Sequence, residues 1–246
     1  MTDAYRFDES STEQAIAYAK IYAGENYSPA METVLKVAFS EKRNLPTFRL
    51  KSSDTILLSG YMKKWVGAYL AGYNNRPSVR TGNCSGTHPD PMAKTILRAR
   101  ISGLEDNLAD KIVARHSLLM TIENNIGELL EEYLSVKLSP LGWYCCWGST
   151  IDAVDFCKAD GSLLQIKTSD NSENSSSSRV RQGTPIGKWF RRFSRRPGVY
   201  NYAMRNRMLG RPGYVSESDF RAFAEKTIAA NPACIYIAAN HLLNRP

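Results

Sequence analysis

The chain has few of the features that mark membrane, secreted or metal-cluster proteins. Its 246 residues contain no apolar run near the roughly 20 residues that span a bilayer. The N-terminal stretch MTDAYRFDESSTEQ is too acidic and polar for a secretory signal. Three histidines are scattered, and five cysteines include no Cys-x-x-Cys pair, so the usual zinc and disulfide patterns are missing. We therefore expect a cytoplasmic protein with reduced cysteines and no membrane association.

Acidic residues are missing from one long stretch. Residues 174–216 contain no Asp or Glu but hold ten Lys and Arg, nine of them Arg. The stretch alone carries +10 against +8 for the whole chain, so the remainder is slightly acidic. A basic run is often only a solvated surface, but Arg is also suited to paired hydrogen bonds with phosphate and guanine. Its concentration here favours a nucleic-acid-binding segment at about residues 170–212.

The first hundred residues have helical patterns and no recognisable motif. Apolar spacing and capping residues predict helices at 11–23, 28–43 and 52–73, the second opening on Ser28-Pro29. Residues 74–91 are rich in Pro, Gly, Asn and Ser, which predicts a loop that joins two parts or becomes ordered on a ligand. We expect residues 1–106 to form an N-terminal helical subdomain.

Residues 107–246 have a different organisation. A long helix is predicted at 108–138, followed by a short strand at WYCCWGS and two hairpin strands. A basic helix or loop, the helix SESDFRAFAEKTIAAN and a terminal strand ACIYIAA complete the predicted order. This order indicates an α/β layer with a mixed sheet.

Residues 151–167, IDAVDFCKADGSLLQIK, have the pattern of a β-hairpin. Apolar and β-branched residues flank Ala-Asp-Gly at 159–161, which predicts a three-residue turn. In that register Lys158 lies opposite Ser162, whereas a two-residue turn would shift every pair by one position.

The same register places three polar groups on one face of the hairpin. Asp155 falls across from Gln165, and Lys167 points the same way because it is two residues further along the strand. Asp152 falls on the other face, so Asp155 is the preferred carboxylate. These are the groups that a metal-dependent phosphodiesterase site needs.

The element order and the hairpin resemble the PD-(D/E)XK nuclease superfamily. Val154-Asp155 stands where that family has Pro-Asp, and Gln165-Ile166-Lys167 where it has (Asp/Glu)-x-Lys. The run GELLEEYLSVKLSPLGW resembles the family's preceding helix, which often contributes a Glu. Glu131 is the candidate there and Glu128 the alternative, although a helical Glu is more commonly a solvent-facing residue.

A narrower resemblance covers about residues 115–195. HSLLMTIENNIGELLEEYL, VDF and LLQIKTSDNSENSSSSRVRQGTPIGKWFR resemble type II restriction endonucleases of the SinI-like group. This resemblance implies a restriction-endonuclease-like core of helix, mixed central sheet and helix. It also implies a Mg²⁺-dependent homodimer that cuts double-stranded DNA at a palindromic, G/C-flanked site similar to GGWCC and leaves 5′-phosphate ends.

The resemblance assigns roles to individual residues. Asp155, Gln165, Lys167 and Glu131 are implied to be catalytic, and Mg²⁺ would be held by Asp155, Gln165 and the Ile166 carbonyl. Gln165 replaces an acidic residue, and a neutral amide binds Mg²⁺ more weakly than a carboxylate does. The change places a greater share of metal binding on Asp155 and the Ile166 carbonyl, with Glu131 as a further candidate.

The residues after the hairpin are the implied DNA contacts. A flexible linker is the alternative reading of the serine run, and the sequence does not separate base contacts from phosphate contacts. The candidate residues are Asn171, Asn174, Ser175, Ser176, Ser177, Ser178, Arg179, Arg181, Lys188, Arg191 and Arg192.

Two other functions fit part of the pattern. A structure-specific nuclease similar to a junction resolvase would share the helix and hairpin, but it would normally be shorter and lack NSENSSSS. A DNA-binding protein with a decayed site is favoured by Gln165 and opposed by the intact pair of Asp155 and Lys167.

Overall fold

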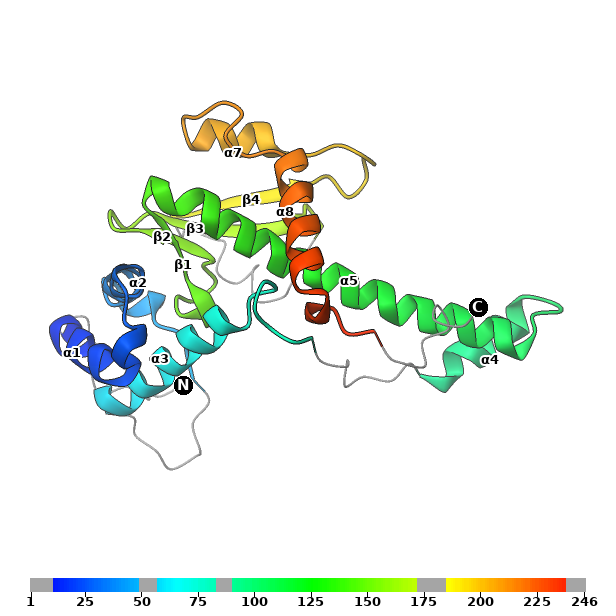
Figure 1. Cartoon of the computed structure of the whole chain (residues 1–246), viewed down its shortest axis with the longest axis horizontal. Helices are drawn as coiled ribbons and strands as arrows, with labels where there is room; N and C mark the ends of the chain where they lie inside the picture. Colours follow the sequence, from blue (N-terminus) through cyan, green and yellow to red (C-terminus); the bar gives the residue numbers. More distant parts are fainter. Residues whose placement is uncertain (1–10, 49–56, 83–89, 172–184, 238–246) are drawn as a thin grey trace.

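The computed structural model describes residues 11–48, 57–82, 90–171 and 185–237. Figure 1 shows a central sheet crossed by two helices, α5 and α8, with the N-terminal helices α1–α3 beside β1 and helix α7 beside β4. The result is a mixed α/β fold that is compatible with the expected restriction-endonuclease-like core.

Three helices precede the long loop. They are α1 (Thr12–Ala23), α2 (Pro29–Ala38) and α3 (Leu58–Asn74), close to the expected ranges. The start of α2 follows directly from its sequence, because the Met31 backbone N–H donates to Ser28 Oγ at 3.2 Å and Pro29 occupies the first helical position. Residues 52–56 of the third expected helix lie outside the described residues.

Two further helices form an arm. Helix α4 (Pro91–Arg100) was not predicted, and α5 (Asp106–Leu138) is the expected long helix with a start two residues earlier. Helix α4 packs along the first half of α5, and in Figure 1 this pair projects away from the sheet. We refer to residues 91–123 as the arm.

The sheet has four strands in the order β1-β2-β3-β4. Strands β1 (Trp143–Cys145), β2 (Phe156–Lys158) and β3 (Leu163–Ser169) are antiparallel neighbours, and β4 (Ile186–Arg192) runs parallel to β3. The expected hairpin register is confirmed, because Phe156 pairs with Leu164. At the turn, the Lys158 backbone N–H donates to the Ser162 carbonyl at 2.9 Å.

Two expectations about the order of elements were wrong. The basic residues 186–192 form β4 rather than a helix or loop, and buried Trp189 and Arg191 alternate there with exposed Lys188 and Arg192. This period of two is the strand pattern, which the accumulated charge obscured in the sequence. In the expected terminal strand ACIYIAA, residues 233–237 form no strand, and 238–239 lie outside the described residues.

Two helices follow β4. Helix α7 (Tyr202–Met208) was not predicted, whereas α8 (Glu217–Ala230) matches the expected helix. Ser216 caps α8, because its Oγ accepts from the Asp219 backbone N–H at 3.1 Å.

The N-terminal helices share one hydrophobic core with the sheet and α8. Trp65 of α3 is fully buried and donates through Nε1 to the Thr150 carbonyl at 2.9 Å. Helix α3 also contacts the turn at Trp147–Ser149, where a Cβ on Gly148 would lie 2.0 Å from the Ala68 carbonyl oxygen. The expected subdomain therefore packs directly on the nuclease-like part, and its boundary at residue 106 stays a prediction. Within the described helices, none has the length and apolar character of a membrane span.

Candidate active site

Asp155 lies immediately before β2, with its carboxylate over the neighbouring strand. Its Oδ2 accepts a 2.6 Å hydrogen bond from the Ile166 backbone N–H of β3. Burial raises the pKa of Asp155 to about 6, although the Ile166 N–H and the charge of Lys167 both act to lower it. A carboxylate held in this way is prepared to receive a cation.

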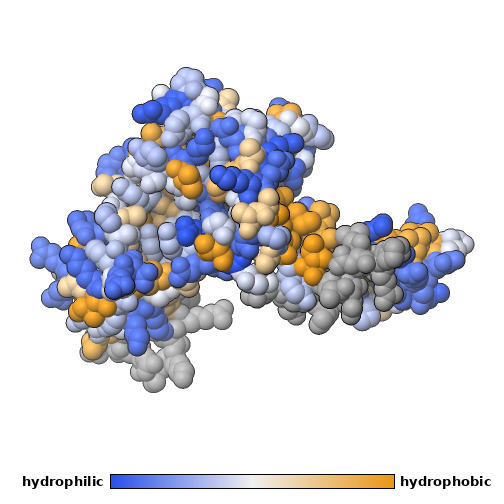
Figure 2. Space-filling view, viewed as in Figure 1, coloured by the Kyte–Doolittle hydropathy of each residue, from blue (hydrophilic) through white to orange (hydrophobic). Residues whose placement is uncertain are grey.

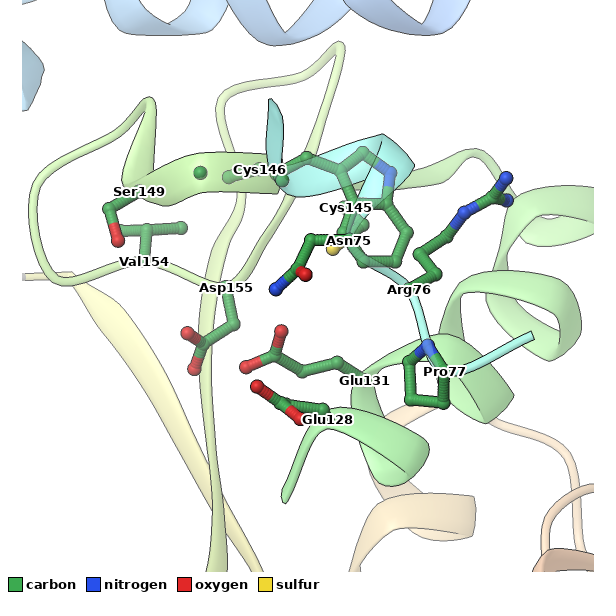
Figure 3. A pocket seen from close by; sticks show the side chains of 13 residues that line it. Asn75, Arg76, Pro77, Glu128, Glu131, Cys145, Cys146, Ser149, Val154 and Asp155 are labelled. Atoms are coloured by element: carbon green, nitrogen blue, oxygen red, sulfur yellow. The ribbon is translucent and has the colours of Figure 1, made fainter. Parts of the chain in front are cut away.

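Glu131 of α5 approaches the same space. Figure 3 shows the carboxylates of Glu131 and Glu128 extending from α5 toward Asp155. Burial, followed by the charges of Asp155 and Glu128, raises the pKa of Glu131 to about 8, and Lys167 opposes the shift. The three carboxylates and Lys167 are therefore electrostatically linked.

The neighbouring glutamates of α5 are occupied by other partners. Glu128 forms an ion pair with Arg80, and Glu132 is buried and accepts from the Ser78 backbone N–H at 3.1 Å. No cation or hydrogen-bond donor in the described part of the chain is paired with the Glu131 carboxylate. The geometry thus favours Glu131 over Glu128 as the helix-borne carboxylate of the site.

Gln165 has a structural contact that the sequence did not suggest. Its Nε2 donates to the Ala153 carbonyl at 3.1 Å, and the side chain is buried. Ala153 and Ser149 have φ values of 57° and 56°, a left-handed conformation that is unfavourable for residues with a Cβ. The amide of Gln165 therefore fastens the loop that leads into Asp155, a bond that a carboxylate could not donate.

The parallel pairing of β3 and β4 extends the polar face of the hairpin. Gln165 lies beside Lys188, Lys167 beside Phe190, and Ser169 beside Arg192. Paired residues on neighbouring strands point to the same face of a sheet. Lys188 and Arg192, both exposed, thus share a face with Gln165 and Lys167.

The other candidate DNA contacts fall into two groups. Asn171 is exposed and accepts from Ser169 Oγ at 2.7 Å, whereas Arg191 is buried and donates to both carboxylate oxygens of Glu217 at 2.8 Å. Arg191 is committed to packing in this structure, which argues against its predicted contact with DNA. The candidates outside the described residues are Asn174, Ser175, Ser176, Ser177, Ser178, Arg179 and Arg181.

Sequence reasoning missed one wall of the site. Asp155, Glu131 and Glu128 line a pocket of about 290 Å³ whose opposite side is formed by Asn75, Arg76 and Pro77. These three residues follow α3, where composition predicted only a loop. The Asn and Pro content marked the segment, but no residue in it had a spacing that indicated a role.

The donor atoms of this pocket fit a hard divalent cation. In the described ranges, no three His, Cys, Asp or Glu side chains are arranged to hold a metal ion by themselves. Burial is the main cause of the raised pKa values of Asp155 and Glu131, the charges of Asp155 and Glu128 add to the rise for Glu131, and Lys167 opposes both shifts. The carboxylates of Asp155 and Glu131 are oxygen ligands of the type that Mg²⁺ prefers.

Comparison with known proteins identifies the family of this chain. Residues 57–230 match the family model described as SinI restriction endonuclease. The chain belongs to this family. The match includes the whole of α3, the arm, the sheet and α8, and it confirms the resemblance inferred from the sequence.

Two curated relatives are similar over 144 residues. The Type II restriction enzyme SinI from Salmonella infantis is 42% identical and the Type II restriction enzyme Eco47I from Escherichia coli 40% identical. Each alignment covers 56% of this chain and 61% of the relative. The chain thus spans about three fifths of the length of the curated relatives that it matches.

Proposed function

We propose that this SinI-family protein is a type II restriction endonuclease that hydrolyses phosphodiester bonds of double-stranded DNA in the cytoplasm. The observation that carries the proposal is that Asp155 and Glu131 line one pocket, with Lys167 close enough to lower the pKa of both. The names of the two relatives support the reaction class. A palindromic, G/C-flanked target similar to GGWCC and 5′-phosphate products remain part of the proposal.

Mg²⁺ is the proposed cofactor. Asp155, Glu131 and the Ile166 carbonyl would hold it, with Gln165 Oε1 as a further oxygen on the same strand. Bound there, the ion would lower the pKa of a water molecule and neutralise charge that develops on the phosphate.

The chain's own residues supply the rest of the chemistry. Lys167 lies near enough to both carboxylates to influence their pKa, so its ammonium can donate to a phosphate oxygen and stabilise the charge of the transition state. Asp155 is held in place by the Ile166 N–H, which limits the movement of its second oxygen. Burial of the two carboxylates excludes water that would weaken these interactions.

DNA would lie across the sheet face that carries Lys188 and Arg192. Both are exposed and aligned with Gln165 and Ser169 of β3, so phosphate contacts there would continue the line of the cleavage site. Asn171, Asn174, Ser175 to Ser178, Arg179 and Arg181 are proposed as further DNA contacts.

A homodimer is proposed because one pocket cleaves one strand, and a palindromic target has two-fold symmetry. The arm supports this proposal: of its described side chains, Ala109 alone is fully buried. Leu108, Leu119 and Ile122 lie on one face of α5 by helical spacing, and each is at least 37% exposed, as are Met92 and Ile96 of α4. Figure 2 shows apolar side chains gathered along this part of the molecule.

The charge of the arm suits a second copy of the chain better than DNA. Residues 91–123 hold five Lys and Arg against four Asp and Glu, in contrast with the strongly basic segment near β4. Ion pairs of Lys94 with Asp106 and Asp110 and of Arg98 with Asp106 join α4 to α5 within one arm. Two arms packed through their apolar faces would form a four-helix bundle without charge repulsion.

The deciding experiment incubates the purified protein with unmethylated phage DNA in Mg²⁺ or EDTA and sequences the ends. Discrete Mg²⁺-dependent fragments that share one short palindrome are expected, and Lys167→Ala should abolish them. Cleavage confined to branched DNA would favour a junction-resolvase-like nuclease. Tight binding to duplex without cleavage would favour a decayed DNA-binding protein.

A further inference from the structure

The active-site pocket is closed by a segment that lies outside the predicted nuclease part of the chain. Residues 75–82 follow α3, and Asn75 is the residue at which that helix ends. The Asn75 backbone N–H donates to the Ala71 carbonyl at 2.9 Å, so its position is fixed by the helix. Asn75 lines the pocket together with Asp155 and Glu131.

Several polar contacts hold this segment against α5 and the C-terminal region. Arg80 pairs with Glu128, and the Asn231 side chain donates to the carbonyls of Pro77 and Arg80 at 2.9 and 2.8 Å. The Gly82 backbone N–H donates to the Ala233 carbonyl at 2.7 Å. The wall is therefore a fixed part of the site, tied on both sides to elements that appear much later in the chain.

The side chain of Asn75 is directed into the site. Figure 3 shows its amide pointing into the space between Asp155 and Glu131, whereas the guanidinium of Arg76 points away from them. Arg76 is occupied elsewhere, because it donates to the Tyr73 carbonyl at 2.6 Å and lies 3.6 Å above the Tyr73 ring. Asn75 thus offers the acidic pocket a neutral group that can donate hydrogen bonds.

We propose that Asn75 is a catalytic residue whose side-chain amide donates to an oxygen of the scissile phosphate. The inference rests on the proposed endonuclease function and adds to it a residue outside the hairpin and α5. An anionic phosphodiester must approach two carboxylates, so it needs hydrogen-bond donors that offset their charge. Lys167 supplies one from β3, and Asn75 supplies the other from the end of α3.

The first test separates binding from cleavage. Asn75→Ala is expected to lower the single-turnover cleavage rate about 10- to 100-fold, in the range found when one donor to a developing oxyanion is removed. Its dissociation constant for the same duplex in EDTA should change less than about threefold, since one hydrogen bond is lost among many phosphate contacts. Asn74→Ala is the matched control, because Asn74 is the exposed last residue of α3 and is absent from the lining of this pocket.

The second test needs no cleavage and so separates failure of this inference from failure of the endonuclease function. Asn75→Asp adds a carboxylate beside Glu131, which should raise the pKa of Glu131 further in the free protein, as measured by ¹³C NMR of the side-chain carboxyl. Asn75→Ala should not raise it. A Glu131 pKa unchanged in Asn75→Asp, or an Asn75→Ala cleavage rate within twofold of the wild type, would overturn the proposal.

Discussion

The Arg191 guanidinium donates to both carboxylate oxygens of Glu217, and this ion pair joins β4 to α8 across the back of the sheet. Both side chains are largely buried, at 9% and 14% exposure, and Tyr202 also donates to Glu217 at 3.2 Å. Removal of one partner from a buried pair typically costs about 3 kcal/mol or more. Arg221 also pairs with Glu217, at 3.2 Å, and would offset part of that cost when Arg191 is removed.

Substitution of Arg191 should therefore affect mainly stability, whereas substitution of its neighbour Arg192 should affect mainly DNA binding. Arg191→Ala is expected to lower the free energy of unfolding by about 3 kcal/mol in urea denaturation. Arg192→Ala should change stability by under about 0.5 kcal/mol, because exposed substitutions have small effects, and weaken DNA binding with a shallower salt dependence. Equal stability losses for the two variants would contradict the assignment of Arg191 to the core.

The two glutamates one helical turn apart on α5 should also differ. Glu131→Gln is expected to reduce Mg²⁺-dependent cleavage about 10- to 100-fold, because it removes a proposed metal ligand that faces Asp155. Glu128→Gln should retain most of the cleavage rate and lose stability, since Glu128 binds Arg80. Single-turnover cleavage rates and melting temperatures should be measured for both variants. A larger loss of cleavage in Glu128→Gln than in Glu131→Gln would make Glu128 the active-site carboxylate.

Stability without metal should depend on pH through Glu131. Its pKa is about 8 in the folded protein against an ordinary value of 4.5, so the folded state binds more protons than the unfolded state between these values. The free energy of unfolding should consequently fall as pH rises from about 4.5 to 8. Glu131→Gln should flatten this decline in thermal melts recorded in EDTA, and Glu123→Gln, on the exposed part of α5, should not.

Metal binding should have the opposite pH dependence. Deprotonation of Asp155 and Glu131 must precede coordination, so Mg²⁺ affinity should increase up to about pH 8. Calorimetric titration of the wild type at pH 6, 7 and 8 measures this trend. An affinity independent of pH would exclude Glu131 from the metal site.

The amide at position 165 should be difficult to replace with the acid that related nucleases use. Gln165→Glu would bind Mg²⁺ more tightly, but it would lose the donor to the Ala153 carbonyl and place two acceptors together. We expect the free energy of unfolding measured in EDTA to fall by about 1–3 kcal/mol. Addition of Mg²⁺ should restore part of this stability. Combination with Ala153→Gly, which relieves the left-handed backbone, should restore stability without metal.

The arm should control association. Leu119→Glu is expected to convert the proposed dimer to a monomer in analytical ultracentrifugation without lowering the melting temperature. Val136→Glu is the matched control, because Val136 is also on α5 and 60% exposed but lies outside the arm. A dimer that survives Leu119→Glu would place the interface on another surface.

The hairpin could be predicted from sequence because its information is local. The turn composition at 159–161 set the register, and the register set the positions of Asp155, Gln165 and Lys167. Glu131 was nominated from the resemblance of the run GELLEEYLSVKLSPLGW to the helix that precedes the hairpin in the PD-(D/E)XK family.

The missed features depend on distant contacts. Asn75 is separated from Asp155 by 80 positions, and nothing in its own neighbourhood indicates that it reaches the site. Strand β4 was predicted as a helix or loop because its charged residues alternate with one buried Trp and one buried Arg. The Arg is buried only because it forms an ion pair with Glu217. The pairing of Gln165 with Ala153 likewise follows from backbone geometry that composition does not encode.

The shared core has a consequence for truncated forms of this protein. The pocket combines Asn75, directly after α3, with Glu131 of α5 and Asp155 before β2. The wall carrying Asn75 is tied to Asn231 and Ala233 near the end of the described chain. A chain that lacks residues 231–233 lacks those ties. Such a truncated product should lose the proposed cleavage activity even though Asn75, Glu131 and Asp155 are all present.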